Sequence, residues 1–453
     1  MNPLEYLFGL EYHGHKFGLE HIRLLTDAIG RPQDSWRSVI VAGTNGKGSV
    51  CAMTAAALAA AGHRTGCYTS PHLTQLRERF AINGEWAGAD ELAGVIEDLR
   101  GTIDRLTAAG RLRFAPTFFE VATAAAFEIF RRRRVEVAVL EVGLGGRLDA
   151  TSIAPSLAGA ITNIDFDHQQ YLGDTLAAIA AEKAGIIKPG MTVVCGERRP
   201  EALEVITAAC RARAATLVMA HDGVSCAEVS TVGETTIELA TPGRRYRSVT
   251  LALRGRHQVS NALVAVRLLE AADAAGIRVP GDAVEAGLRD ARWPGRLELM
   301  RLAGGRTALL DAAHNPAGAA TLADYLREAY PGGVPLVFGA VRDKDHAGML
   351  QALLPRVSHL VITAPLTPRA AAPGDLLALA ARLRPGLAVT CEPDPIAALD
   401  RAWAHGPAIV VAGSIFLLGT VRPALVDATP GQAADRAGES GWPAFGPRGN
   451  LRS

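Results

Sequence analysis

The chain of 453 residues has few cysteines, and they are widely spaced. The six are Cys51, Cys67, Cys195, Cys210, Cys226 and Cys391. They form no C-x-x-C pair and no regular pattern, which argues against a disulfide framework and against a thiolate metal site. We therefore expect reduced, buried thiols of the kind found in cytosolic proteins.

The chain also lacks an excess of charge and a long apolar run. Its 47 Lys and Arg residues nearly balance 46 Asp and Glu residues, giving a formal net charge of +1. No overall field recruits nucleic acid or an anionic membrane, so we expect small-molecule partners. The longest apolar run, residues 408–419, is much shorter than the roughly 20 residues that cross a bilayer.

The N-terminal segment lacks the features of a signal peptide. It carries Glu5, Glu11 and Glu20 instead of a basic start followed by an apolar run. We expect a cytoplasmic protein with no membrane partner and no nucleic acid partner.

Residues 1–295 alternate short β-branched segments with longer alanine-rich segments. "SVIVAG" (38–43) precedes a helical pattern over 47–61, and "VEVAVLEVG" (135–143) follows another. This alternation predicts an α/β domain with a parallel sheet and crossover helices, covered on both faces. Between 195 and 255 short strands replace most helices, so we expect a β-rich appendage on the same domain.

A Pro-Gly pair within "RWPGRLE" (292–298) predicts a linker to a second domain. Strand patterns such as "ALLDAA" (308–313) and "PLVFGA" (335–340) then alternate with helical ones. They predict a smaller Rossmann-like domain over 296–426, which is an ordinary domain size. The tail, 427–453, is rich in Gly, Ala and Pro without periodicity, and we expect it to be mobile.

A glycine-rich loop in "VAGTNGKGSVCAM" (41–53) departs from the usual phosphate-binding pattern. In G-x-x-x-x-G-K-[ST] a hydroxyl residue follows the lysine, whereas here Gly48 separates Lys47 from Ser49, and Val41 replaces the first glycine. Because the loop joins a predicted buried strand to a predicted helix, its N–H groups and Lys47 can face an anion. From these residues alone, a phosphate site and a turn without a ligand both remain open.

The loop sequence G-T-N-G-K-G-S resembles the variant phosphate loop of the Mur ligase superfamily, whose ATP-dependent ligases join a carboxylate to an amino acid. Further motifs follow it in this order: "YTSPHL" (68–73), "RERFAING" (77–84), "TFFE" (117–120), "LEVGLGGRLDAT" (140–151), "DHQQYLG" (167–173), "IAAEKAGIIK" (179–188), "GRHQVSNA" (255–262), "PGRLE" (294–298), "DAAHNP" (311–316), "DKD" (343–345) and "GSIFLLG" (413–419). Together they resemble the folylpolyglutamate synthase/dihydrofolate synthase family. The resemblance implies a Mur-ligase-like fold, with a P-loop ATPase domain followed by a Rossmann-like glutamate-ligase domain.

The resemblance also implies an ATP site built from both domains. Its residues are Asn45, Gly46, Lys47, Gly48, Ser49, Asn261, Arg296 and Asp311. Arg296 belongs to the linker, so it reaches the triphosphate only when the two domains close; an interdomain salt bridge is its alternative role. His314 and Ser414 match positions near the incoming glutamate, although either could cap a helix or order a loop.

Three residues from separate segments are candidates for a magnesium site. Glu141 ends a predicted strand at the edge where α/β sheets bind ligands, and Mg²⁺ prefers oxygen ligands. By itself, Glu141 could equally cap the loop that follows it, and His168 could be a packing histidine. The resemblance implies that Ser70, Glu141 and His168 bind Mg²⁺.

Lys183, in "EKAG", would ordinarily be a solvated lysine on a helix. The resemblance implies that Lys183 is carbamylated and so becomes an anionic oxygen donor that can hold a second Mg²⁺. Carbamylation requires the neutral amine, so a lysine with a lowered pKa is predisposed to it. Together with Lys47 and His168, Lys183 is a predicted catalytic residue.

The stretch "GGRLDAT" resembles the bifunctional bacterial form of the family. The resemblance implies a dihydropteroate site formed by Thr117, Phe118, Phe119, Glu120, Leu148, Asp149 and Ala150. A carboxylate such as Asp149 can accept paired hydrogen bonds from a pterin edge, and Phe118 or Phe119 can supply an apolar wall. The alternative is that Asp149 only shapes the turn after the glycines.

We therefore expect an ATP-dependent amide ligase of folate metabolism. It would use ATP, Mg²⁺ and L-glutamate to convert dihydropteroate to dihydrofolate and to extend tetrahydrofolate polyglutamates, through an acyl phosphate. Both halves of the expected site lie in one chain, so we expect a monomer. The alternatives are a monofunctional folylpolyglutamate synthase, a cell-wall Mur ligase and a nucleotide-dependent switch protein. Ser152 and Gln169 depart from the usual family residues, asparagine and threonine, which concerns specificity rather than activity.

Overall fold

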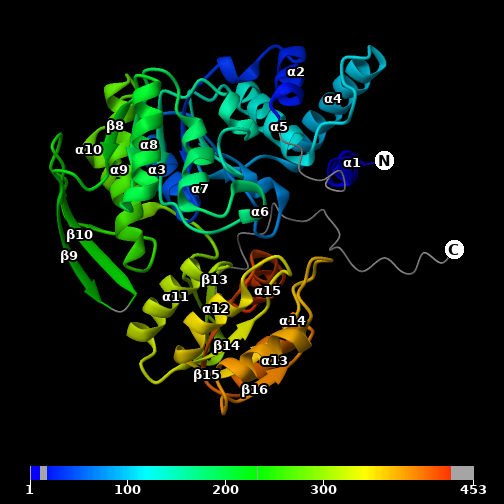
Figure 1. Ribbon diagram of the computed structural model, residues 1–453, viewed down its shortest axis with the longest axis vertical. Helices are drawn as coiled ribbons and strands as arrows, with labels where there is room; N and C mark the ends of the chain where they lie inside the picture. The colour runs from blue at the N-terminus through cyan, green and yellow to red at the C-terminus, as the bar shows by residue number, and fades with distance from the viewer. Residues whose placement is uncertain (1, 11–17, 232, 430–453) are drawn as a thin grey trace.

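The computed structural model describes residues 2–10, 18–231 and 233–429, and it has two α/β parts (Figure 1). Elements up to α10 (Gly281–Asp290) belong to the upper part, and elements from β12 (Glu298–Arg301) onward form the lower part. We call these parts the large and the small domain. The predicted division at residue 295 falls between these elements, and it stays a prediction.

The large domain is built on one eight-stranded sheet. From edge to edge its strands are β4 (Glu85–Trp86), β3 (Phe80–Ile82), β2 (Thr65–Tyr68), β5 (Val137–Glu141), β1 (Arg37–Ala42), β6 (Ala158–Ile161), β7 (Thr192–Cys195) and β8 (Thr216–Met219). The six strands from β2 to β8 in this order run parallel, and β3 and β4 add an antiparallel edge. This confirms the predicted parallel sheet.

Helices cover both faces of this sheet, which explains why its strands are apolar throughout. Ile40 of β1 packs on one face, while its neighbours Val39 and Val41 pack on the other. The first face carries α1 (Pro3–Gly9), α2 (Glu20–Ala28), α4 (Ala89–Ala108), α5 (Phe118–Arg132), α6 (Gln169–Leu172), α7 (Leu176–Lys183) and α8 (Pro200–Ala212). The second face carries α3 (Lys47–Ala60), α9 (His257–Ala274) and α10. None of the described helices is long and apolar enough to span a membrane.

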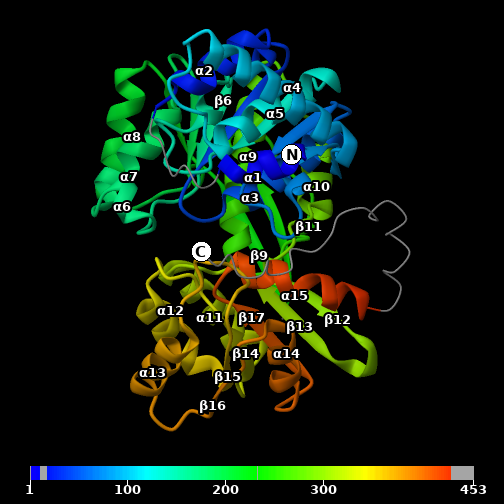
Figure 2. The same ribbon diagram turned by 90° about the vertical axis from the view of Figure 1, so that its right-hand side faces the viewer.

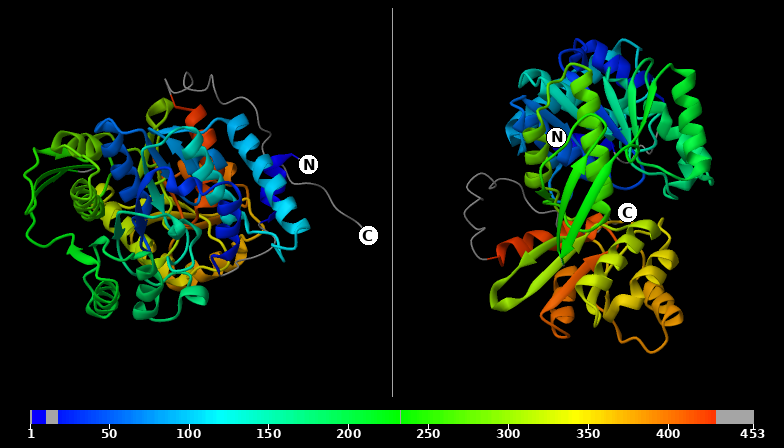
Figure 3. Two further views of the ribbon diagram at one scale, coloured as in Figure 1. Left: turned by 90° about the horizontal axis from the view of Figure 1, so that it is seen from above. Right: turned by 90° about the vertical axis from the view of Figure 1, so that its left-hand side faces the viewer.

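The β-rich appendage is shorter than the sequence predicts. Residues 200–219 form α8 and β8, which extend the main sheet instead of interrupting it. The appendage is a separate antiparallel sheet of β9 (Ser225–Thr231), β10 (Glu234–Ala240) and β11 (Val249–Thr250). Figure 3 shows this hairpin reaching from the large domain towards the small one. At the start of α9, Arg256 pairs with Glu328 of the small domain at 3.3 Å.

The small domain is built on a six-stranded sheet. From edge to edge its strands are β12, β13 (Thr307–Asp311), β17 (Ala408–Ala412), β14 (Val334–Phe338), β15 (Val357–Ile362) and β16 (Val389–Cys391). Its helices are α11 (Pro316–Ala329), α12 (His346–Leu353), α13 (Pro373–Leu383), α14 (Pro395–Trp403) and α15 (Ile415–Asp427). All strands except β12 are parallel, as predicted for a Rossmann-like domain. The mobile tail predicted from residue 427 lies, from 430 onward, outside the described residues.

The two sheets meet where the functional residues were predicted. The carboxyl ends of β1, β5 and β6 lie at one edge of the large sheet, because parallel strands place these ends together. The small domain lies below this edge (Figure 2). Open α/β sheets bind ligands in the crevice outside such an edge.

Candidate active site

The glycine-rich loop joins β1 to α3, as predicted, and its glycines are required by close contacts. Gly46 has φ of 84°, and a Cβ there would lie 2.4 Å from the Asn261 side-chain oxygen. A Cβ at Gly48 would lie 2.4 Å from the Trp293 ring. A side chain at Gly46 would push the loop away from Asn261, and one at Gly48 would push it away from Trp293. The loop backbone therefore lies close against these two residues.

Lys47 opens α3 and turns back over the loop. Its ammonium group donates to the carbonyl oxygens of Gly43 and Thr44, both at 3.0 Å. The Lys47 charge therefore lies beside the loop backbone, at the N-terminus of a helix whose free N–H groups favour an anion.

A cavity of about 170 Å³ lies between the domains at this loop. Predicted residues that line it are Asn45, Gly46, Lys47, Gly48, Ser49, Ser70, Glu141, His168, Lys183, Asn261, Arg296, Asp311 and His314. The structure thus brings together every residue predicted for ATP and for metal, and one of the two predicted for glutamate.

Ser70 and Glu141 form the oxygen-rich part of this cavity. The Ser70 backbone N–H donates to Glu141 Oε2 at 3.1 Å, whereas the buried Ser70 hydroxyl has no hydrogen-bond partner among the described residues. Burial raises the pKa of Glu141, although the charges of Lys47 and Arg296 oppose this shift. A buried hydroxyl without a partner next to a buried carboxylate fits a hard, oxygen-binding cation such as Mg²⁺.

His168 approaches the same cavity from the loop after β6. It adopts a left-handed backbone conformation with φ of 51° and stands at the N-terminus of α6. Burial lowers the pKa of His168 to about 4, against the opposing charge of Asp167. Its imidazole is therefore neutral near pH 7, the form that can bind a metal. No group of three His, Cys, Asp or Glu side chains in the described ranges could hold a metal, so a metal here needs Ser70, water or substrate oxygens as well.

Lys183 is buried, so it is not the solvated helix lysine of the alternative interpretation. It is 5% exposed, and its Nζ donates to the Gly43 carbonyl oxygen at 2.9 Å, the same oxygen that Lys47 contacts. Burial and the nearby Lys47 charge lower the pKa of Lys183 to about 7. A large fraction of its amine is then neutral at physiological pH, which is the condition for carbamylation.

Arg296 and Asp311 reach the cavity from the linker and from the end of β13. Asp311 is fixed by two backbone N–H groups, those of Leu297 and Ala313, each at 2.9 Å. Arg296 has no carboxylate within ion-pair distance among the described residues, so the salt bridge proposed as its alternative is not found. Arg296 lines the cavity, where burial raises the pKa of Asp311 and the Arg296 charge opposes this shift.

Asn261 is tied to the phosphate loop by a residue that the sequence analysis did not single out. Gln258 accepts from Asn261 Nδ2 at 2.9 Å and donates to the Ser49 hydroxyl at 3.2 Å. Gln258 is 1% exposed and lines the cavity beside His257, whose pKa burial lowers to about 4. His257 and Gln258 lie in the "GRHQVSNA" motif, which also contains Asn261, the residue predicted to bind ATP.

Ser414 does not reach this cavity. Its hydroxyl accepts from the Phe416 N–H at 3.1 Å and caps α15, which matches the helix-cap alternative. His314 does line the cavity, where its Nδ1 contacts the Ala312 carbonyl oxygen at 2.8 Å. The glutamate role of both residues stays a prediction.

The residues predicted to bind the pterin lie beside the cavity, not on its surface. Thr117 and Glu120 form a capping box at the start of α5, in which Glu120 Oε2 accepts from the Thr117 N–H at 2.8 Å. Phe118 stacks on Phe8 with 5.8 Å between ring centroids. Phe119 covers Gly143, a cavity residue, so closely that a Cβ at Gly143 would lie 2.6 Å from the ring.

Asp149 is used within its own loop. Its Oδ2 accepts from the N–H groups of Gly143 and Leu144, and its Oδ1 accepts from Thr151, at distances between 2.6 and 3.0 Å. These hydrogen bonds match the alternative role of Asp149, in which it shapes the turn after the glycines. Each carboxylate oxygen already accepts two hydrogen bonds, so neither is free to bind a pterin edge. Leu148 is half-buried and Ala150 is buried in the same turn. The pterin role of this group stays a prediction.

Asp167, Asn315 and Lys344 join the domains at the cavity, and they were not among the predicted site residues. Asp167 contacts Lys344 at 2.5 Å, Asn315 at 3.2 Å and His314 at 3.4 Å, all from the small domain. Hydrogen bonding from His314 and the charges of His168 and Lys344 overcome burial and lower the pKa of Asp167 well below its usual range. These residues belong to the quoted "DHQQYLG", "DAAHNP" and "DKD" motifs, but no local pattern shows that they meet.

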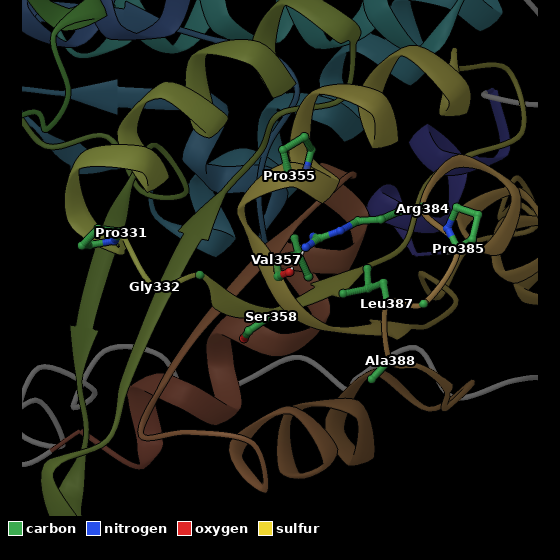
Figure 4. A pocket seen from close by; sticks show the side chains of 11 residues that line it. Pro331, Gly332, Pro355, Val357, Ser358, Arg384, Pro385, Leu387 and Ala388 are labelled. Carbon is green, nitrogen blue, oxygen red and sulfur yellow. Dashed lines mark hydrogen bonds between the residues drawn. The ribbon is translucent and has the colours of Figure 1, made fainter.

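A larger hollow of about 530 Å³ lies elsewhere on the small domain (Figure 4). Its lining residues are mostly Pro, Gly and small apolar residues, with Arg384 the one ionisable side chain. The Arg384 guanidinium donates to the backbone carbonyl oxygens of Leu354 and Val357. This hollow lacks the acids, bases and glycine-rich loop of the interdomain cavity.

Comparison with known proteins agrees with this geometry. The Mur ligase middle domain matches residues 113–269, and the Mur ligase, glutamate ligase domain matches residues 295–415. The dihydrofolate synthase/folylpolyglutamate synthase of Mycobacterium tuberculosis is 40% identical, over 81% of this chain and 78% of that protein.

Solved structures agree as well. A folylpolyglutamate synthase from Mycobacterium tuberculosis complexed with ADP and AMPPCP matches with a TM-score of 0.86 and 34% identity, covering 93% of this chain and 99% of that chain. A bifunctional folylpolyglutamate synthase/dihydrofolate synthase with Mn, AMPPNP and L-glutamate bound matches with a TM-score of 0.80 and 30% identity, covering 94% and 98%.

Proposed function

Because the chain belongs to the dihydrofolate synthase/folylpolyglutamate synthase family of Mur ligases and is an ATP-dependent ligase, we propose that it joins L-glutamate to two folate substrates. One is dihydropteroate, which gives dihydrofolate, and the other is a tetrahydrofolate with a growing glutamate tail. The observation that carries this proposal is the interdomain cavity, which gathers the phosphate loop, the Ser70 and Glu141 oxygens and Arg296. This set suits the transfer of a phosphoryl group to a carboxylate.

The first step is formation of an acyl phosphate. The loop N–H groups and Lys47 bind the ATP phosphates, and Arg296 reaches them from the linker. The folate carboxylate attacks the γ-phosphorus, and ADP leaves. This step depends on positioning and on neutralising charge, which Lys47 and Arg296 provide without covalent chemistry.

The second step forms the amide. The amine of L-glutamate attacks the acyl carbon, and phosphate leaves. His314, on the small domain, lies where it can orient this glutamate, whereas Ser414 would act only by fixing the start of α15. The closed domains exclude water, which would otherwise hydrolyse the acyl phosphate.

We propose that Ser70, Glu141 and His168 hold Mg²⁺, which supplies positive charge next to the phosphates when it is bound. The buried Ser70 hydroxyl without a partner and the neutral His168 imidazole support this assignment. Lys183, once carbamylated, would add an anionic oxygen to the same cavity. The Mn-bound bifunctional relative supports divalent metal use in the family.

For the pterin, the structure supports an aromatic wall more than a carboxylate contact. Phe119 covers the cavity residue Gly143, so its ring lies next to the cavity, where it can form one wall of the pterin site. Asp149 would act by holding the Gly143 and Leu144 backbone in place. The cytoplasmic location and the monomeric state expected from the sequence stay predictions.

The decisive test is ADP release by the purified chain with Mg²⁺ and ATP. We expect release to require both glutamate and a folate substrate and to match amide formation. Conversion of dihydropteroate to dihydrofolate establishes the first activity, and tail extension on tetrahydrofolate establishes the second. If tetrahydrofolate is extended but saturating dihydropteroate is untouched, the monofunctional alternative replaces the bifunctional one. ATP hydrolysis that ignores both substrates would indicate a switch protein.

A further inference from the structure

Asp167 of the large domain makes its cross-domain contacts with three side chains of one small-domain surface. Its Oδ1 receives the Lys344 ammonium at 2.5 Å, and its Oδ2 receives Asn315 Nδ2 at 3.2 Å and lies 3.4 Å from His314 Nε2. The Asp167 and Lys344 side chains are each 9% exposed. The carboxylate thus lies in a largely buried seam between the domains.

Asn315 extends this seam to the phosphate loop. Its Nδ2 also donates to Asn45 Oδ1 at 3.0 Å, and Asn45 Nδ2 lies 3.4 Å from Asn315 Oδ1. The Asn315 side chain is itself fixed, because its Oδ1 accepts from the Gly318 N–H at 2.8 Å at the start of α11. One small-domain residue therefore contacts both the phosphate loop and the loop that carries His168.

A second ion pair between the domains shows why the burial of this seam matters. Arg256 and Glu328 are 3.3 Å apart, but their side chains are 66% and 40% exposed. Exposed pairs of this kind contribute little to stability, whereas removing one partner of a buried pair leaves an uncompensated charge. Of these two ion pairs, the contact of Asp167 with Lys344 is therefore the one whose loss should cost more.

We propose that Asp167, Asn315 and Lys344 form a closure latch, which holds the small domain over the phosphate loop for the lifetime of the acyl phosphate. The inference rests on the proposed function, since the latch matters for catalysis only if an acyl phosphate forms. While the latch is closed, the glutamate amine reaches the acyl carbon. When it opens, water attacks the acyl phosphate and gives back the carboxylate and phosphate, so ATP is spent without an amide. All three are positioning residues, which act through the placement of the small domain.

The first test measures how many ADP molecules the full-length enzyme releases for each amide formed. In Lys344→Met and Asn315→Ala we expect this ratio to rise several-fold and the rate of ligation to fall about tenfold or more, because water gains access to the cavity. Lys344→Arg keeps the charge and should restore most of the coupling. Glu328→Gln is the matched control, since it removes the exposed ion pair from the same domain, and it should leave the ratio and the rate unchanged.

Two further measurements separate a latch from a direct role of Lys344 with substrate. The double variant Asp167→Asn with Lys344→Met should have a ligation rate and an ADP-to-amide ratio no worse than those of the more damaging single variant. Both substitutions remove the same contact between Asp167 and Lys344. Small-angle X-ray scattering with AMPPNP and Mg²⁺ should show wild type and Glu328→Gln compact, and Lys344→Met and Asn315→Ala expanded. Unchanged scattering and coupling in folded Lys344→Met and Asn315→Ala would overturn the latch, as would a loss of rate without a change in coupling. If no folate substrate is accepted, the proposed function fails, while the scattering comparison still decides whether the latch holds the domains together.

Discussion

At the scale of single residues, the site depends on charges that the fold has removed from water. Lys47 and Lys183 both donate to the Gly43 carbonyl oxygen, so two amines lie close together at the phosphate loop. In the proposed mechanism only Lys47 needs to stay charged, and burial favours the neutral form of Lys183. The two lysines are thus suited to different tasks, Lys47 as a cation and Lys183 as a reactive amine.

Lys47→Ala should abolish ligation and leave the fold intact. Removing a preorganised charge that faces the phosphates costs a factor on the order of 10²–10³ in turnover. The measurement is kcat for ADP release, with thermal unfolding as the check on folding. Arg289→Ala, which removes a surface charge paired with its neighbour Asp290, is the control and should keep wild-type turnover. Near-normal turnover in folded Lys47→Ala would remove the phosphate assignment.

Glu141→Ala should raise the Mg²⁺ concentration needed for activity or eliminate activity. Its carboxylate and the Ser70 hydroxyl are oxygens that a cation in this cavity can use, so Ser70→Ala should act in the same direction and more weakly. A Mg²⁺ titration of activity and a crystal structure with an ATP analogue would check both. An ion bound away from Glu141 in that structure would contradict the assignment.

Lys183→Ala should lose activity that acetate partly restores, because a small carboxylate can replace the carbamate oxygens. The same lysine should become carbamylated more readily as the pH rises through about 7, since its ammonium form, which dominates below that pH, cannot react with CO₂. The carbamate can be measured by ¹³C NMR with labelled bicarbonate. A pH-independent signal, or no signal in active enzyme, would argue against carbamylation of this residue.

At the scale of elements, the backbone of the loop between β1 and α3 lies close to α9. The contact between Gly46 and Asn261 leaves no space for a side chain. The Gln258 side chain links Asn261 to Ser49, so it connects the start of α9 to the phosphate loop. Nucleotide affinity should therefore depend on this contact as much as on Lys47.

Gly46→Ala should weaken ADP binding by about tenfold or more, because the new Cβ would force the loop away from Asn261. The positive φ adds a strain of about 1–2 kcal/mol for any L-residue. Gly62→Ala is a matched control, since Gly62 has φ of 91° and nothing within 4 Å of the Cβ position. Calorimetric titration with ADP should show weaker binding in Gly46→Ala alone, because both variants carry the backbone strain but only Gly46→Ala adds the contact with Asn261. Equal ADP affinity in the two variants would show that the contact is not needed.

At the scale of the whole molecule, the site exists only where two domains meet. The loop residues, Glu141 and His168 come from the large sheet, whereas Asp311 and His314 come from the small one. Neither domain alone contains the full set. A ligand that bridges the cavity must therefore stabilise both domains.

Binding of AMPPNP with Mg²⁺ should stabilise the whole chain by about 2.7 kcal/mol at a ligand concentration one hundred times Kd. Because the ligand contacts both domains, hydrogen exchange should slow in residues 43–49 and also in 311–315. Exchange measured with and without ligand checks this directly. Protection confined to the large domain would show that nucleotide binds without the second domain.

The sequence by itself determined the class of fold, and it predicted many of the residues that line the interdomain cavity. Apolar strands and alanine-rich helices predicted both parallel sheets, because strands that are buried on both faces leave short, continuous apolar runs between helical segments. The phosphate loop and ordered motifs identified the residues that now line one cavity. The predicted extent of the β-rich appendage was wrong, since residues 200–219 form α8 and the last strand of the main sheet. No local signal marks which sheet a strand joins.

Only the tertiary structure decided which side chains meet and which are already occupied. Asp149 and Ser414 carry groups that could bind a ligand, but hydrogen bonds within their own segments use those groups. Asp167 and Lys344 are 177 positions apart, and their contact depends on the packing of two domains. The pKa of Lys183 falls because the fold buries it beside Lys47. Burial, distance and competition for hydrogen bonds are properties of the folded chain, so a reading of residue types and spacing could not supply them.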